Sequence, residues 1–363
     1  MTTPISDHLM AGITARDVDT ARLRVRVLER AAVGEEKGVV VFVHGNVSSS
    51  LFYQPTMLAL DPAFRALALD LRGFGETERL PVDATRGLGD FADDVIAAVD
   101  ALGVERAHFV GWSMGGGVVM RIAIDNSHRV ASLCLESPVS PYGFGGTRLD
   151  GSLLTPDAAG TGGGGANPDF VARLAANDTS DESPTSPRNV YRGTYVADAS
   201  AIDNEDLWVH AMLTTATGEE NYPGDATASE SWPGFAPGTR GVLNTMAPTH
   251  CDLSGLVNIV PKPPITWIRG SADAIVSDAS LFDLNHLGAL GAIPGWPGAD
   301  VAPAQPMVSQ TRVVLERYAA GSPGLVDEVV FDGCGHSPHL ERPSEFIAAL
   351  HALLDRARAA GDA

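Results

Sequence analysis

Residues 111–115 spell Gly-Trp-Ser-Met-Gly, with the serine two positions from a glycine on each side. The apolar run at 106–112 predicts a buried strand, and the residues from there to about 126 predict a helix. A sharp strand-to-helix turn lifts the central hydroxyl out of the sheet edge, above a helix N-terminus. The glycines are expected because side chains at their positions would collide with neighbouring backbone. Ser113 is therefore the candidate nucleophile.

A serine hydroxyl is a weak nucleophile unless a base removes its proton. His336 lies in residues 333–338 (Gly-Cys-Gly-His-Ser-Pro), directly after the last expected strand at 326–331. That position predicts the same sheet edge as Ser113, so His336 is the candidate base. His44 is better interpreted as structural, with its ring bonded to nearby backbone.

The base in turn needs a carboxylate that holds its tautomer and stabilises its charged form. Asp273 follows the expected strand at 265–268 and is the preferred candidate. Its alternative role is an Asx turn. Glu136, at the end of the strand at 130–136, and Asp278 are the other acids that could serve.

Backbone N–H groups must stabilise the negative oxygen that forms when a serine attacks a carbonyl. Met114, directly after the nucleophile, is expected to supply one. Asn46 is expected to supply the other, with Val47 as the alternative, because both follow the apolar strand at 38–43. Loss of one such donor typically lowers the rate on the order of 10²–10³-fold.

Aromatic residues near these positions are candidate pocket residues. Trp112 precedes the nucleophile, Val47 lies in the loop after the strand at 38–43, and Phe52 and Tyr53 follow that loop. All four residues could line a pocket. Three further tryptophans lie in irregular segments, where a tryptophan normally covers something. They either line the pocket or pack an insertion onto the core: Trp208, Trp232 and Trp296.

Strand and helix patterns alternate along most of the chain, which predicts parallel βαβ units with right-handed crossovers. The fold class is therefore α/β, a mostly parallel sheet flanked by helices. Expected strands lie at 21–30, 38–43, 64–70, 106–112, 130–136, 265–268 and 326–331. Expected helices lie at 88–102, 113–126, 308–318 and 343–358.

The alternation is interrupted twice by segments rich in Gly, Pro, Ser, Asn and Asp. Residues 138–262 contain an uninterrupted run of four glycines and two short helical patches, at 170–176 and 207–215. Residues 277–306 are irregular as well. Much of the excess of 39 glycines and 24 prolines lies in these two segments, which are expected to cover the site and set its specificity.

The chain of 363 residues has a formal net charge of −20, which opposes binding to nucleic acids and to anionic lipid surfaces. Its three cysteines do not suggest a disulfide framework. No signal peptide or apolar run of bilayer length is evident. A cytoplasmic protein without membrane or nucleic-acid partners is expected, and the sequence carries no evidence about oligomeric state.

The chain resembles the α/β-hydrolase superfamily. The matching features are His44-Gly45, the Asp70-x-Arg72-Gly73-x-Gly75 turn, the serine turn, and the order nucleophile, acid, histidine along the chain. The resemblance covers 1–137 and 263–363 as the core, and 138–262 falls where the family inserts a cap. Haloalkane dehalogenases and epoxide hydrolases of this fold use an aspartate nucleophile, whereas this chain has a serine.

These observations predict a serine hydrolase that cleaves a carboxylic ester or lactone of neutral or apolar character, without a metal or organic cofactor. A C–C bond hydrolase, an amidase or peptidase, and an acyltransferase could use the same residues. A non-catalytic binding protein on a hydrolase scaffold is a more remote alternative.

Overall fold

The structure, a computed structural model, describes residues 8–322 and 324–361. Its centre is an eight-stranded sheet with the strand order β1-β2-β4-β3-β5-β6-β11-β12. The strands are β1 (Thr14–Asp19), β2 (Arg24–Arg30), β3 (Gly38–Val43), β4 (Phe64–Leu69), β5 (Ala107–Trp112), β6 (Val130–Glu136), β11 (Ile265–Gly270) and β12 (Val326–Phe331).

Six neighbouring strands of this sheet, from β4 to β12, run parallel, and β2 and β1 add an antiparallel edge. Every residue of β5 is buried, and five of the six residues of β3 are buried. This is typical of strands covered on both faces. Because parallel strands end at one edge of the sheet, the loops after β3, β5, β11 and β12 meet there.

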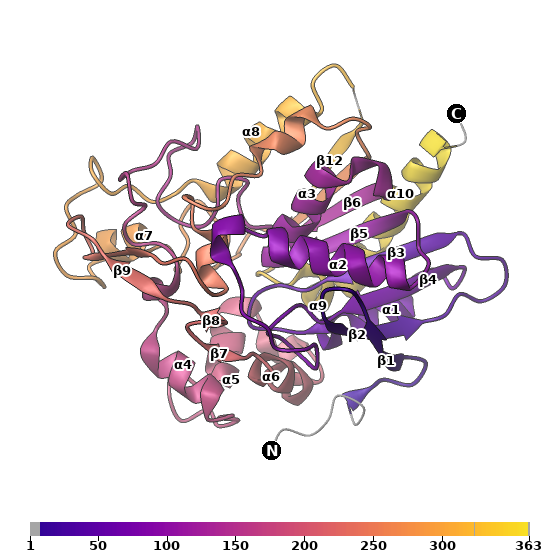
Figure 1. Cartoon of the computed structure of the whole chain (residues 1–363), viewed down its shortest axis with the longest axis horizontal. Coiled ribbons are helices and arrows are strands. Elements are labelled where there is room, and N and C mark those ends of the chain that lie inside the picture. Colours follow the sequence, from indigo (N-terminus) through magenta and orange to yellow (C-terminus); the bar gives the residue numbers. More distant parts are fainter. Residues whose placement is uncertain (1–7, 323, 362–363) are drawn as a thin grey trace.

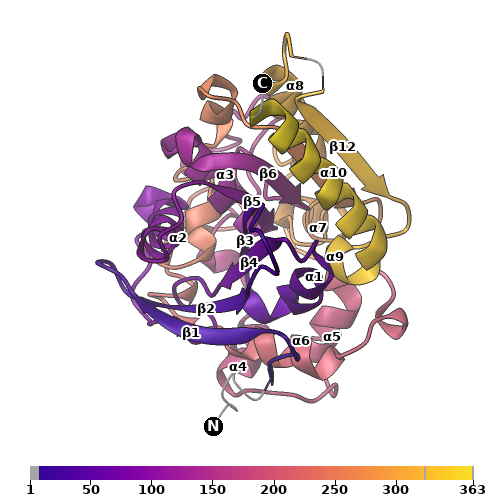
Figure 2. The same cartoon turned by 90° about the vertical axis from the view of Figure 1, so that its right-hand side faces the viewer.

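Helices cover both faces of the sheet (Figure 2). One layer contains α2 (Gly89–Ala101), α3 (Met114–Asp125) and α8 (Met307–Tyr318). The other contains α1 (Gln54–Ala59), the single turn α9 (Pro338–Glu341) and α10 (Pro343–Gly361). No helix in the described ranges is long and apolar enough to span a bilayer.

The predicted α/β architecture is confirmed, and all seven predicted strands and four predicted helices of the core are present within a few residues. β1 is not among the strands expected from the sequence. Only one residue of this edge strand is buried, so it lacks the apolar periodicity that marked the others.

The chain between β6 and β11 contributes no strand to the main sheet and lies at one side of it, in pink to orange in Figure 1. The predicted helical patches appear as α4 (Pro168–Ala175) and α6 (Glu205–Leu213). The other elements of the segment are short: α5 (Pro187–Val190), a π-helical turn (Tyr191–Tyr195), β7 (Thr217–Gly218), β8 (Tyr222–Pro223), β9 (Ala226–Ala228) and β10 (Phe235–Pro237).

The second irregular segment, 277–306, contains one helix, α7 (Leu284–Ala289), which is labelled in Figure 1. Indole N–H groups hold the two segments by hydrogen bonds to backbone carbonyls. Trp232 donates to the Pro294 carbonyl at 2.9 Å, and Trp296 donates to the Ala302 carbonyl at 3.0 Å. Trp208 is buried against Phe52, with ring centroids 5.1 Å apart. Trp208 therefore packs its segment onto the core, as one of the two predicted roles required, whereas Trp232 and Trp296 pack the two irregular segments against each other.

Candidate active site

Ser113 sits at the turn between β5 and α3 with φ 57° and ψ −121°, a backbone conformation that is strained for a residue with a side chain. The glycines on either side are required by packing. A Cβ on Gly115 would lie 2.1 Å from the Val43 carbonyl oxygen, and one on Gly111 would lie 2.3 Å from the Gly115 carbonyl oxygen. The tight turn expected from the sequence is therefore present, and a side chain at either glycine would force it apart.

His336 and Asp273 are in direct contact. His336 Nδ1 lies 2.8 Å from Asp273 Oδ2, and both side chains are only 2% exposed. The other carboxylate oxygen, Oδ1, accepts hydrogen bonds from the N–H groups of Ile275 at 2.8 Å and Val276 at 2.9 Å. Asp273 thus forms the Asx turn that was its alternative role and also binds the histidine, and the turn fixes the carboxylate that orients the ring.

The two other candidate acids make different contacts. Asp278 is exposed and accepts hydrogen bonds from the Val308 and Ser309 N–H groups at the start of α8. Glu136 is fully buried and binds His339, with its Oε1 2.7 Å from the ring Nδ1 and 2.8 Å from the backbone N. Neither reaches His336, so the structure favours Asp273.

Glu136 also links the two halves of the site. Its backbone carbonyl accepts the Ser113 N–H at 2.9 Å, while its carboxylate holds the turn that follows His336. Trp112 makes a second link, because its indole N–H donates to the His336 carbonyl at 2.8 Å. These two hydrogen-bonded links fix the backbone of the candidate base relative to the backbone of the candidate nucleophile, and neither was predicted from the sequence.

The loop that contains Asn46 and Val47 lies directly against Ser113. A Cβ on Gly45 would lie 2.8 Å from Ser113 Cβ. Val47 has φ 46°, an uncommon value for a β-branched residue. Within the described residues, the N–H groups of Asn46, Val47 and Met114 donate to no protein acceptor. They remain free for an oxygen of a ligand.

One hydroxyl holds this loop from the segment between β6 and β11. The Tyr195 hydroxyl lies 3.0 Å from both the Asn46 and the Val47 carbonyl oxygens and shares its proton between them. The Asn46 carbonyl shares a peptide unit with the Val47 N–H, so this hydrogen bond orients one candidate donor and holds the loop that carries the other. Tyr195 was also missed, because a tyrosine in an irregular segment carries no spacing signal.

The predicted structural role of His44 is confirmed. Its Nδ1 lies 2.7 Å from the Gly45 carbonyl oxygen, and its Nε2 accepts the Leu71 N–H at 3.0 Å. Burial lowers the pKa of His44 to about 4, so the ring stays neutral near pH 7. A neutral ring with one donating and one accepting nitrogen bridges the loop after β3 to the loop after β4.

Ser113, His336, Trp112, Asn46 and Val47 line one cavity of about 490 Å³. Most of its other lining residues come from 138–262 and 277–306, which we call the roof segments. Ser113 Oγ and His336 make no hydrogen bond to each other within the described residues; such contacts often tighten only when substrate binds.

The expectation that Phe52 and Tyr53 line the pocket is wrong. Both side chains are fully buried, and neither borders the cavity. Phe52 packs against Trp112 and Trp208, while Tyr53 packs against Phe42 and His339. The position after the Val47 loop therefore supplies core packing beneath the site rather than its wall.

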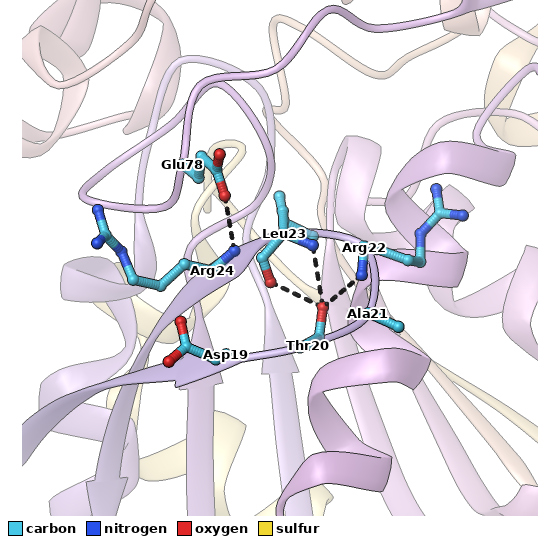
Figure 3. Close-up of a pocket in the computed structure, with 7 residues that line it drawn as sticks. All are labelled: Asp19, Thr20, Ala21, Arg22, Leu23, Arg24 and Glu78. Carbon is cyan, nitrogen blue, oxygen red and sulfur yellow. Dashed lines mark hydrogen bonds between the residues drawn. The ribbon is translucent and has the colours of Figure 1, made fainter.

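A second hollow, of about 370 Å³, lies at the turn between β1 and β2 (Figure 3). Thr20 Oγ1 donates to the Leu23 carbonyl and accepts the N–H groups of Arg22 and Leu23, and Glu78 accepts the Arg24 N–H. These bonds hold the hairpin turn. The lining includes neither a histidine nor a cysteine, and its one hydroxyl is engaged in the turn.

Comparisons with known proteins agree with this fold. Residues 38–161 match the family model described as the alpha/beta hydrolase fold. A stretch of 135 residues is 39% identical to the dihydrolipoyllysine-residue acetyltransferase component of the acetoin cleaving system of Cupriavidus necator, covering 36% of this chain and 32% of that protein. The chain spans less than half the length of each of the first curated relatives it matches.

Two further matches extend over nearly the whole chain. Epoxide hydrolase A of Mycobacterium tuberculosis is 25% identical over 352 residues, covering 94% of this chain and 97% of that protein. The carboxylesterase CesB from Bacillus subtilis superposes with a TM-score of 0.56 at 16% identity, covering 94% of this chain and 91% of that one. Together with the parallel sheet and the serine turn, these matches show that the chain has the α/β-hydrolase fold.

Proposed function

We propose that this protein is a serine hydrolase that cleaves a carboxylic ester or lactone. The observation that carries the proposal is the 2.8 Å contact of Asp273 with His336, which lines the same cavity as Ser113 at its strained turn. Asp273 fixes the tautomer of His336 and stabilises its protonated form, which is the requirement for general base catalysis at a serine.

The reaction proceeds in two halves. Ser113 Oγ attacks the ester carbonyl carbon while His336 Nε2 takes its proton, and the N–H groups of Met114 and Asn46 stabilise the negative oxygen. The C–O bond to the alcohol then breaks, and His336 returns the proton to the leaving oxygen. In the second half His336 activates water, which attacks the acyl-enzyme, releases the acid and restores the serine hydroxyl.

The serine also separates this proposal from epoxide opening, the activity in the name of one relative. A carboxylate that opens an epoxide forms an ester, which water can hydrolyse. A serine that opened an epoxide would form an ether, which this site has no means to cleave. With Ser113 as nucleophile, a cycle that turns over therefore requires an acyl group.

We further propose that residues 138–262 form a cap over a core made of 1–137 and 263–363. Most of the cavity lining comes from this segment, including Tyr195, which supports the candidate oxyanion loop. Closure over the site would exclude water from the acyl-enzyme until the alcohol has left.

The test is a steady-state comparison of p-nitrophenyl acetate, a γ-lactone and acetyl p-nitroanilide, with Ser113→Ala as the matched background. The proposal predicts ester or lactone turnover at least about 10³-fold above that of the variant, with anilide cleavage far slower. An unchanged thermal unfolding curve for the variant shows that its fold is intact. Turnover retained by Ser113→Ala, or an anilide cleaved faster than every ester, contradicts it.

A further inference from the structure

The cavity wall carries almost no charge. Its described lining contains no lysine and no arginine, and Asp283 is its only carboxylate. The two oxygens of Asp283 accept backbone N–H groups, from Asn285 at 2.9 Å and from Gln305 at 2.7 Å. A negatively charged substrate would therefore lose its water in this cavity without meeting a cation, which costs several kcal/mol.

One part of the mouth of the cavity is apolar. Leu281 and Phe282 line the cavity, yet they are 46% and 44% exposed to solvent. Their backbone is held in place, because the Leu281 N–H donates to the Ala274 carbonyl at 2.9 Å and the Phe282 N–H donates to Ser280 Oγ at 3.0 Å. The fixed backbone thus keeps two large apolar side chains at the opening. Their exposure to water is unfavourable, and a bound apolar group would remove part of that exposed surface.

This apolar rim continues inward to the reacting groups. Leu284 and Leu287 of α7 line the cavity beside the rim. Ile275 and Val276 line it next to Asp273, whose carboxylate accepts their N–H groups. An extended chain could therefore lie against apolar side chains from solvent to the catalytic histidine.

We propose that the site selects uncharged esters in which the acyl or the alcohol part is an extended apolar chain that leaves the cavity past the exposed side chains of Leu281 and Phe282. This inference rests on the proposed ester hydrolysis and names its substrate class. Each methylene buried along this path strengthens transition-state binding, so kcat/KM rises on the order of two- to fourfold per methylene until the chain passes the rim.

The experiment measures kcat/KM of the full chain on two series. One is p-nitrophenyl esters from acetate to octanoate, and the other is acetate esters of alcohols of increasing length. A third comparison sets p-nitrophenyl hexanoate against its analogue with a carboxylate at the far end of the chain. We expect at least one series to rise with length and the charged analogue to react at least about 100-fold more slowly than hexanoate.

Variants then assign the effect to the rim. The double substitution Leu281→Ser with Phe282→Ser is expected to lower the long-to-short ratio of kcat/KM about tenfold. Leu290→Ser is the matched control, because Leu290 is 60% exposed on the same insertion but does not line the cavity. It should leave the ratio unchanged.

The outcomes separate this inference from the proposed function. Flat or falling series, equal rates on the charged analogue, or the same loss in Leu290→Ser overturns the substrate class while ester turnover persists. If no ester of any length is turned over, and Ser113 is not acylated, the proposed function fails.

Discussion

The sheet edge and the roof segments build the same cavity by different physical means. At the sheet edge, Ser113 and His336 follow β5 and β12, and the parallel register between neighbouring strands fixes where each strand ends. In the roof segments, short elements and turns are held by individual polar contacts such as the Tyr195 hydroxyl on the Asn46 carbonyl. The difference teaches that regular structure positions the chemistry, while loops that can vary independently shape the substrate pocket.

The largest expected effect concerns the acid. Asp273→Asn leaves the Asx turn but presents an amide to His336, which disfavours the tautomer that can accept the serine proton. We expect kcat to fall roughly 10³–10⁴-fold, measured on the best ester substrate. Asp278→Asn, five residues later, is the matched control, because the Asp278 carboxylate binds N–H groups at the start of α8 and not His336, and it should keep kcat within about twofold. Equal effects of the two substitutions would remove Asp273 from the mechanism.

Substitutions at two glycines compare how tightly the sheet edge and the roof segments are packed. A Cβ on Gly115 would lie 2.1 Å from the Val43 carbonyl oxygen, whereas one on Gly193, in the roof, would meet nothing within 4 Å. We expect Gly115→Ala to lower the free energy of unfolding by about 3 kcal/mol or more, and Gly193→Ala to change it by less than about 1 kcal/mol. Urea unfolding measures both. Similar losses would show that the roof is packed as tightly as the turn.

The buried side chain of His108, in β5, is expected to make the free energy of unfolding depend on pH. Burial, with Arg106 and Arg358 nearby, lowers the pKa of His108 from its ordinary value of about 6.5 to about 4. Between these pH values the unfolded chain binds the proton more readily, so the stabilisation present above about pH 6.5 is lost as pH falls toward 4, by about 3 kcal/mol.

The variant His108→Asn removes this titration. The difference in free energy of unfolding between wild type and variant should therefore shrink by about 2–3 kcal/mol between pH 7.5 and pH 4. A difference that stays constant over this range would mean that His108 is not held neutral in the folded sheet.

The smallest expected effect concerns Tyr195, whose hydroxyl connects the roof segments to the loop at the sheet edge. Tyr195→Phe removes the hydroxyl shared by the Asn46 and Val47 carbonyls, which loosens the candidate oxyanion donors. We expect kcat to fall about tenfold with a smaller change in KM. Tyr191→Phe is the control, because the buried Tyr191 hydroxyl has no hydrogen-bond partner among the described residues. A loss confined to KM would assign Tyr195 to substrate binding alone.

Most of the core could be predicted from the sequence because its strands are buried on both faces and its helices carry one apolar face. Those requirements leave continuous apolar runs and a 3.6-residue period. The edge strand β1 buries only one residue and leaves no such trace. The roof segments could be delimited by their composition, but their structure depends on contacts between distant residues, such as Trp232 with Pro294.

The candidate site divides in the same way. Ser113, Asp273 and His336 could be proposed because each follows a strand and because turn geometry demands glycines beside the serine. Phe52 was misplaced because an aromatic residue near a functional loop packs equally well beneath it. Tyr195 and the rim pair Leu281 and Phe282 were missed because only the folded roof brings them to the cavity.

The central claim is that Ser113 is an activated nucleophile, and covalent labelling tests it most directly. The folded protein is treated with a fluorophosphonate, and the adduct is located by mass spectrometry of the intact chain and its peptides. The account predicts one adduct per chain, on Ser113, with parallel loss of ester turnover and no adduct in Ser113→Ala. A folded chain that stays unlabelled, or an adduct on another residue, would contradict it.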